Sequence, residues 1–194
     1  MTEPIIPFTH TIRRFVAISD TEGEEIFRYF KRERLAAGQY FVKKDQVCDS
    51  VGFIESGMVR HFYLQEGEEV TRWVSLENEF VTALSSFISG KPCSHYLQAI
   101  GNCRIWTLRK PVWTELLQNH AFIREFWLRV LEFNVMGFED RIYQQLAGNA
   151  EQRYRFFMER FPDFIEKVPQ KYIASMIGIK PESLSRLRKK LAKK

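Results

Sequence analysis

The pattern of apolar and polar positions divides the chain into three stretches that differ in period. Apolar residues first recur at helical spacing within residues 9–35, where Ser19 and Glu22 have the spacing of an N-terminal capping box. Short β-rich runs replace the helical period from residue 38 to residue 108, and the helical period returns after Pro111. This order predicts an α+β fold in which the strands lie between two helical segments of the chain.

Six short runs in the middle stretch have the composition of β-strands. They are rich in β-branched and aromatic residues, and turn signals such as Ser56-Gly57 and Glu66-Gly67 separate them. The predicted strands cover residues 39–42, 51–55, 58–64, 70–76, 94–100 and 103–108. Short strands at this spacing predict a double-stranded β-roll, which is similar in layout to a jelly-roll barrel.

The C-terminal segment, residues 170–194, combines two short amphipathic patterns with Gly178 between them. Gly178 suits a left-handed turn, and Pro181 suits the first position of a following helix, where its missing N–H has no intrahelical partner. Two helices joined by a short glycine-containing turn are typical of the helix-turn-helix that reads DNA. A surface helical hairpin is the alternative, although spacing, turn residues and charge together favour the DNA-reading motif. The apolar positions of the two patterns are Ile173, Ile177, Ile179, Leu184 and Leu187.

Basic residues gather at the end of this segment. Six of the nine residues from Arg186 to Lys194 are basic and none is acidic, whereas the whole chain carries a net charge of only +5. Such a cluster neutralises DNA phosphates, while contacts to base edges supply sequence specificity. We therefore expect double-stranded DNA as a partner, with Glu182 and Arg186 reading bases and the basic residues after position 187 holding phosphates. The full set of expected DNA-contacting residues is Lys180, Glu182, Ser183, Arg186, Arg188, Lys189 and Lys190.

A long apolar stripe marks the helical stretch between Trp113 and Leu146. Its members are Phe122, Phe126, Val130, Phe133, Phe138, Ile142 and Leu146. A stripe of this length must be buried, either against the chain's own core or against a second copy of the helix. We expect a homodimer paired through residues 120–147, because helix-turn-helix proteins usually pair to read two half-sites.

Gly148 and Asn149 resemble the glycine that ends one helix and the N-cap that begins the next, so a domain boundary is expected there. The predicted organisation is a β-roll domain over residues 1–119, a long dimerisation helix over residues 120–148 and a helix-turn-helix domain over residues 149–194.

Composition is typical of a globular protein of a reducing compartment. Hydrophobic residues make up 45% of the chain and low-complexity tracts are absent, which argues against disorder. No apolar run approaches the length of a signal peptide or a membrane span, so we expect a cytoplasmic protein with no membrane partner. The three cysteines are widely spaced, which argues against a disulfide framework and against a zinc or iron–sulfur cluster.

A metal-dependent cupin enzyme is the main catalytic alternative for a barrel of this kind. It would need two histidines within a residue or two of each other and a following carboxylate. The four histidines are instead scattered along the chain: His10, His61, His95 and His120. We expect no enzymatic activity, no catalytic residue, no metal ligand and no cofactor. A haem or metal role for His95 and a redox role for Cys93 with Cys103 remain open as minor alternatives.

A helical start, a β-roll, a long helix and a helix-turn-helix, in that order, resemble the Crp/Fnr superfamily of bacterial transcription regulators. The stretch VGFIESGMVRHFYLQEGEEV is similar to the family's hairpin, with Gly57 at the family glycine. The resemblance covers nearly the whole chain and implies an effector domain, a dimerisation helix, DNA binding and contact with RNA polymerase. The base-contacting Arg–Glu–x–x–x–Arg pattern of the family's activators falls on Pro181, Glu182 and Arg186, so only the last two residues match.

The resemblance also implies an effector pocket in the β-roll. Cyclic-nucleotide-binding members use a Gly-Glu pair and an Arg-Ser pair, which make charge-assisted hydrogen bonds to the phosphate and ribose. Here Thr82-Ala83 and Cys93-Ser94 occupy those positions, and Phe138 stands where the long helix usually has a small hydroxyl residue. The implied pocket residues are Thr82, Ala83, Leu84, Ser85, Cys93, Ser94 and Phe138. Because the arginine and the glutamate are missing, we expect no tight binding of cyclic AMP or cyclic GMP; an effector, if the protein has one, is expected to be an apolar or weakly polar small molecule.

Two functions are compatible with this sequence. The first is a sequence-specific DNA-binding transcription regulator. The second is a ligand-binding β-roll sensor or scaffold whose helical tail contacts another protein. Glu182 and Arg186 favour the first function, because a helix that contacts protein would more often display an apolar stripe on its exposed face.

Overall fold

The computed structural model describes residues 4–191, and the contacts within the chain divide it into two compact units. Of the described residues, unit 1 comprises 4–61 and 75–133, and unit 2 comprises 62–74 and 134–191. Three elements cross from one unit to the other: the strands β4 (Val59–Gln65) and β5 (Glu68–Ser75) and the helix α5 (Ala121–Ala147). The predicted domain boundaries flank α5, whereas the division into units falls inside it.

Unit 1 opens with two short helices, α1 (Ile5–Arg13) and α2 (Asp20–Phe27). The predicted capping box begins α2, because the Ser19 hydroxyl accepts a hydrogen bond from the Glu22 amide (3.2 Å). In return, the Glu22 carboxylate accepts a hydrogen bond from the Ser19 amide (2.7 Å). The capping box therefore places the start of α2 where the sequence predicts it.

The helical prediction for residues 9–35 is wrong at its end. Residues Lys31–Leu35 form strand β1, which pairs with β8 (Cys103–Arg109) along its whole length. Helix propensity is a weak preference, and the pairing of β1 with β8 overrides it in this Lys-Arg-Glu-Arg-Leu segment.

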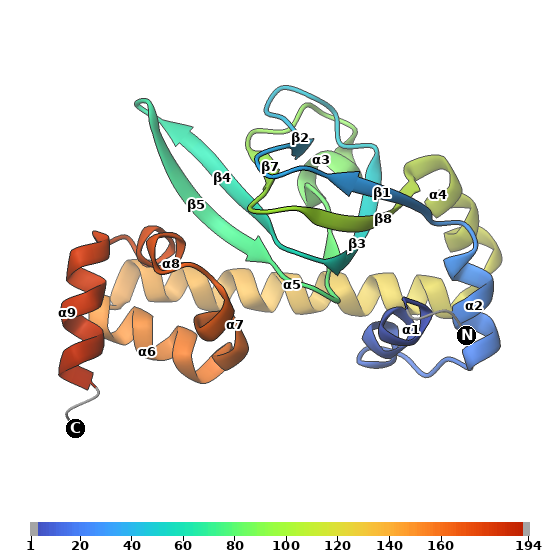
Figure 1. Cartoon of the computed structure of the whole chain (residues 1–194). Helices are drawn as coiled ribbons and strands as arrows, with labels where there is room; N and C mark the ends of the chain where they lie inside the picture. Colours follow the sequence, from blue (N-terminus) through green and yellow to red (C-terminus); the bar gives the residue numbers. More distant parts are fainter. Residues whose placement is uncertain (1–3, 192–194) are drawn as a thin grey trace. The chain divides into compact units, whose positions relative to one another are not determined.

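Eight strands within the described residues form two four-stranded sheets (Figure 1). The strands not yet named are β2 (Tyr40–Val42), β3 (Ser50–Ser56), β6 (Phe80–Val81) and β7 (Tyr96–Ala99). The sheet orders are β1-β8-β3-β6 and β2-β7-β4-β5, and β8 pairs antiparallel with both β1 and β3. All six predicted strands are present, and the two-sheet arrangement confirms the predicted β-roll. The sequence did not predict β6, because two residues are too few to show a strand period.

Phe8 of α1 lies at the centre of the unit 1 core. It is fully buried, and its ring meets those of Phe27, Phe30 and Phe53 edge-on at centroid separations between 5.0 and 5.3 Å. The turn between β3 and β4 requires Gly57, which has a φ of 96° and no room for a side chain. A Cβ at this position would lie 2.8 Å from the Asn102 carbonyl oxygen.

Two helices follow the last strand of the roll. Helix α4 (Lys110–Asn119) ends where His120 adopts an extended conformation, and α5 begins at the next residue. Phe126 of α5 is buried in the unit 1 core, and Phe122 and Val130 pack against that core. No helix within the described residues is long and apolar enough to cross a membrane.

Unit 2 contains four helices after α5: α6 (Ala150–Arg160), α7 (Pro162–Lys167), α8 (Gln170–Met176) and α9 (Pro181–Leu191). Asn149 caps α6 as predicted, because its side-chain oxygen accepts a hydrogen bond from the Gln152 amide (3.0 Å). The prediction that Gly148 ends the preceding helix in a left-handed conformation is wrong, because its φ is not positive. A Cβ there would instead lie 2.7 Å from the Gln144 carbonyl oxygen, so close packing requires the glycine.

The end of the β4–β5 hairpin packs with these helices inside unit 2. The Trp73 ring of β5 lies 4.8 Å from that of Phe164 and 5.3 Å from that of Phe161, measured between centroids. The Thr71 amide donates a hydrogen bond to the Ser175 hydroxyl of α8 (2.8 Å). These contacts explain why residues 62–74 group with the C-terminal helices.

Candidate nucleic-acid interface and effector pocket

The turn between α8 and α9 has the geometry that the sequence predicts. Gly178 has a φ of 70°, a left-handed conformation that costs most residues with a side chain about 1–2 kcal/mol. Its amide donates to the Ser175 carbonyl (3.1 Å), and the Ile179 amide donates to the Ala174 carbonyl (3.0 Å). Pro181 is the first residue of α9. The buried residues of this helix pair are Ile173, Ala174, Met176, Ile177 and Leu184.

The predicted DNA-contacting residues lie mostly on the exposed part of this motif. Lys180, Glu182, Arg186, Lys189 and Lys190 are exposed, whereas Ser183 and Arg188 are half-buried. Because α9 buries Leu184, the side of the helix that faces solvent is polar and basic. The basic residues Lys193 and Lys194 lie outside the described residues.

Lys190 has an acidic partner that sequence reasoning missed. Its Nζ lies 2.9 Å from a carboxylate oxygen of Glu151 in α6, and Arg155 contacts the other carboxylate oxygen at 2.9 Å. The hydrogen bonds from Lys190 and Arg155 lower the pKa of Glu151 to about 2. Glu151 and Lys190 are 39 positions apart, so no local pattern could have paired them. Within the described residues, Arg186 and Lys189 form no ion pair.

Arg153 of α6 positions the turn of the motif, a role that no pattern in the sequence indicates. Its Nε donates a hydrogen bond to the Ile177 carbonyl (2.8 Å), and its Nη1 donates to the Gly148 carbonyl (2.6 Å). One guanidinium therefore links Gly148, which lies between α5 and α6, to the residue before Gly178.

The residues predicted for the effector pocket are divided between the two units. In unit 1, Ala83 and Cys93 are buried, Thr82 and Leu84 are half-buried, and Ser85 and Ser94 are exposed. The short helix α3 (Leu84–Ser89) begins directly after Ala83. Phe138 belongs to unit 2, where the Arg72 guanidinium carbon lies 5.0 Å from its ring centroid.

Two polar side chains of the unit 1 part of this pocket, those of Thr82 and Cys93, form hydrogen bonds with the chain itself. The Thr82 hydroxyl donates to the Ser50 carbonyl (3.0 Å). The Cys93 thiol donates to the His95 carbonyl (3.1 Å), and its sulfur lies 3.4 Å from Nδ1 of the same histidine. Cys93 is neither cationic nor a strong donor, so a phosphate buried beside it would have no charged partner in that residue.

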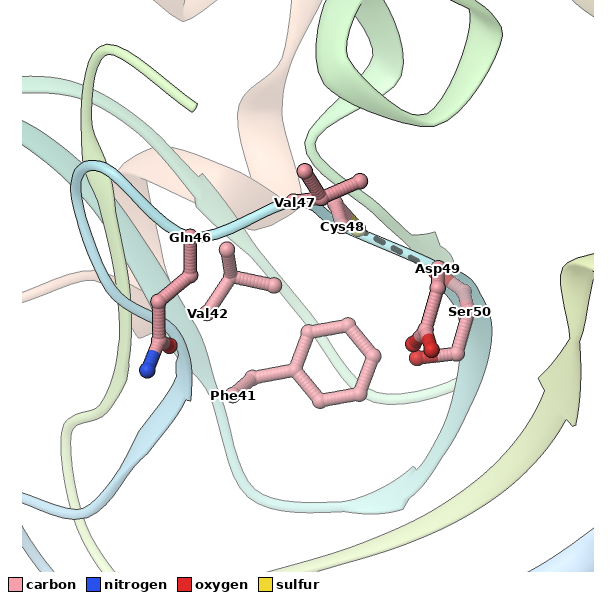
Figure 2. Close-up of a pocket in the computed structure, with 7 residues that line it drawn as sticks. All are labelled: Phe41, Val42, Gln46, Val47, Cys48, Asp49 and Ser50. Atoms are coloured by element: carbon pink, nitrogen blue, oxygen red, sulfur yellow. Dashed lines mark hydrogen bonds between the residues drawn. The ribbon is translucent and has the colours of Figure 1, made fainter. Parts of the chain in front are cut away.

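An open depression of about 400 Å³ lies beside this region in unit 1 (Figure 2). Its lining consists of Phe41, Val42, Gln46, Val47, Cys48, Asp49 and Ser50. Thr82 borders this depression, because its hydroxyl oxygen lies 3.3 Å from the Cys48 sulfur. The lining includes the Asp49 carboxylate, which forms an ion pair with Arg109, and no cationic side chain, so the lining carries no unpaired charge.

The fold brings together two histidines that are far apart in the sequence. His61 and His95 are both buried in unit 1, and their rings stack at a centroid separation of 6.0 Å. Nε2 of His61 lies 3.1 Å from the Ser75 hydroxyl. In the part of the chain that the structure describes, no group of three or more histidine, cysteine, aspartate or glutamate side chains could hold a metal ion.

Cys103, one of the two cysteines considered for a redox role, is a buried free thiol. Burial raises its pKa to about 11, so the thiol stays protonated near neutral pH. Because the thiolate is the reactive form, this environment disfavours redox chemistry at Cys103.

The apolar stripe of α5 changes character along the helix. Phe126, near its start, is only 3% exposed, whereas Ile142 is 59% exposed and Leu146 is 84% exposed. Leu128, Val135, Met136 and Tyr143 are also exposed. The first part of α5 is thus a core helix of unit 1, and its later part presents an apolar face that the described residues leave open.

Residues 32–120 match the family described as the cyclic nucleotide-binding domain. No curated protein has a significant match to this chain.

Several solved structures share the fold at low sequence identity. FixK2 from Bradyrhizobium japonicum has a TM-score of 0.71 at 14% identity, with 84% of this chain and 85% of that chain covered. The catabolite activator protein of Thermus thermophilus has a TM-score of 0.61 at 17% identity, with 94% and 87% covered. A mutant of CooA from Carboxydothermus hydrogenoformans has a TM-score of 0.68 at 16% identity, with 87% and 79% covered. Residues 32–120 therefore match the cyclic nucleotide-binding domain family, and the chain shares its fold with solved structures of the Crp/Fnr type.

Proposed function

We propose that this chain is a transcription regulator that binds double-stranded DNA sequence-specifically through α9. The observation that carries the proposal is the exposed, basic surface of α9, which the left-handed turn at Gly178 holds in place. A helix presented in this way fits the major groove, and its basic side chains neutralise phosphates. The fold that the chain shares with Crp/Fnr-type regulators supports the same function.

The residues of α9 divide into two proposed roles. Glu182 and Arg186 are one turn apart and exposed, so they are placed to read base edges. Lys189 is exposed and has no ion pair within the described residues, so it is the strongest candidate for a phosphate contact. Lys190 is held by Glu151 and would have to leave that carboxylate to bind a phosphate. Lys180, Ser183 and Arg188 complete the proposed interface.

Fluorescence anisotropy with matched and mismatched duplexes tests these roles. Arg186→Ala should weaken binding to the matched duplex by about 1–3 kcal/mol and relax specificity at one base pair. Lys189→Ala should weaken binding to both duplexes alike and reduce its salt dependence. The matched control is Lys167→Ala, an exposed lysine of α7 that should leave both affinities unchanged. If Arg186→Ala and Lys189→Ala behave identically on the two duplexes, the assignment of roles is wrong.

The regulator is proposed to act as a homodimer that pairs through the exposed apolar face of α5. This face extends beyond the part of the helix that the unit 1 core buries, and a second copy of the same helix would cover it. Two copies would present two α9 helices to two half-sites on DNA. RNA polymerase is the further partner that we propose for a regulator of this type.

We propose that the effector is not a tightly bound cyclic nucleotide. A cyclic phosphate in the β-roll would need a cationic partner, and Cys93 stands at the position where the resemblance implies one. Calorimetric titration with cyclic AMP and cyclic GMP should therefore show no binding with a micromolar dissociation constant. A micromolar dissociation constant for either nucleotide would mean that another cation supplies the missing charge.

A further inference from the structure

Unit 2 contains two arginines that lie close together on β5 and α5. The half-buried Arg141 donates a hydrogen bond from Nη2 to the Arg72 carbonyl (2.6 Å). Its guanidinium carbon lies 5.3 Å from the Trp73 ring centroid, while that of Arg72 lies 5.0 Å from the Phe138 ring centroid. Each of the two guanidinium groups therefore packs against an aromatic ring.

This pair of cations has no acidic partner among the described residues. The ion pairs of unit 2 involve other side chains, and neither Arg72 nor Arg141 forms one. The one hydrogen bond from Arg141 uses one of the five N–H donors of its guanidinium. Most of the donors of this side chain are therefore not used by the chain itself.

Arg141 stays positively charged at neutral pH although it is partly buried and lies near another cation. Burial and the neighbouring charge of Arg72 lower the pKa of Arg141 to about 10, and Tyr63 acts in the opposite direction. At neutral pH the guanidinium is still fully charged, because this pKa lies well above 7. A partly buried charge without a counter-charge is unfavourable, so binding an anion would relieve the cost of holding the two cations together.

We propose that Arg72 and Arg141 form a binding site for a small tetrahedral oxyanion, namely a phosphate group. Guanidinium groups match the oxygens of phosphate through paired hydrogen bonds, and partial burial strengthens these bonds. Trp73 and Phe138 hold the two side chains before the anion binds, which lowers the entropy cost of binding. The proposed site lies in unit 2 and shares no cation with the α9 surface, so it does not depend on DNA binding.

Calorimetric titration of the full chain with inorganic phosphate tests the site, at constant ionic strength maintained with chloride. The wild type should bind phosphate saturably, and Arg141→Met and Arg72→Met should each weaken binding at least tenfold. The matched control is Arg160→Met, an exposed arginine of α6 without an ion pair in the described part of the chain, which should bind as the wild type does. If Arg141→Met fails to fold, Arg72→Met carries the comparison, with the rise of the unfolding temperature in phosphate as a second readout.

A parallel titration with glycerol phosphate separates the two sources of the anion. Tighter binding of glycerol phosphate would assign the site to a phosphorylated metabolite, whereas equal affinity would assign it to free phosphate. The proposal is overturned if the wild type shows no saturable binding, or if Arg160→Met weakens binding as much as Arg141→Met does. Loss of phosphate binding in Arg186→Ala would also overturn it, because the anion would then lie on α9.

Discussion

Glu151 shows how single side chains hold the C-terminal helices together. Its two carboxylate oxygens accept hydrogen bonds from Lys190 of α9 and from Arg155 of α6, each at 2.9 Å. These bonds favour the ionised form, which is why the pKa falls from 4.5 to about 2. Arg153, two residues further along α6, bonds the carbonyl before Gly178. The position of α9 therefore depends on contacts that α6 makes with the turn before α9 and with the last turn of α9.

The lowered pKa of Glu151 predicts a pH dependence of stability. Its folded pKa lies below its unfolded value, so its contribution is present above about pH 4.5 and is lost as the pH falls toward 2. Glu151→Gln should thus be less stable than the wild type at pH 7, and the difference should shrink between pH 5 and pH 2. Urea unfolding at several pH values measures it. Glu159→Gln, which changes an exposed carboxylate of the same helix with no ion pair among the described residues, is the control. A gap between Glu151→Gln and wild type that stays constant down to pH 2 would contradict this account.

At the scale of elements, the two parts of α5 have different surroundings. Its first part completes the unit 1 core through Phe126, which rings such as Phe15 and Phe80 contact at 5.7 and 5.4 Å between centroids. Its later part carries Ile142 and Leu146 on an open face. The apolar stripe in the sequence contains both buried and exposed positions. Its helical period cannot distinguish a residue that contacts the chain's own core from one that contacts another copy of the chain.

The open face of α5 predicts a dimer that charged residues would disrupt. The double variant Ile142→Glu/Leu146→Glu should sediment as a monomer at micromolar concentration, while the wild type sediments as a dimer, because two charges would be buried in the pair of helices. Met158→Glu, which changes a residue 42% exposed on α6, should leave the dimer intact. Substitution of Phe126 would not serve, since this residue is in the core. A wild type that stays monomeric would contradict the proposed pairing.

Elements with a strong local signal could be predicted from the sequence, and elements that depend on distant contacts could not. Ser19, Asn149, Gly178 and Pro181 act through their own backbone neighbourhood, and each lies at the predicted helix end or turn. The local pattern predicts a helix where strand β1 forms, because the pairing of β1 with β8 joins segments about 70 residues apart and leaves no local signal.

At the scale of the whole molecule, the order of the elements was sufficient to identify the fold. The β-roll, the long helix and the helix-turn-helix are each visible in the pattern, and the comparisons confirm the fold. The chemistry of the sites was less accessible. The Glu151–Lys190 pair, the bond from Thr71 to Ser175 and the Arg72–Arg141 pair all join residues that the sequence separates widely. Side chains brought together by folding leave no periodic trace in a single sequence.

Selection from a random pool of duplex DNA tests the central claim most directly, namely that two copies of α9 read a specific sequence. The account predicts enrichment of a palindromic motif with two half-sites, and the same selection with Arg186→Ala should lose preference at one base pair in each half-site. Lys167→Ala should enrich the same motif as the wild type. If the wild-type protein enriches no motif, α9 does not read DNA, and the chain is better explained as a ligand-binding β-roll whose helical tail contacts protein.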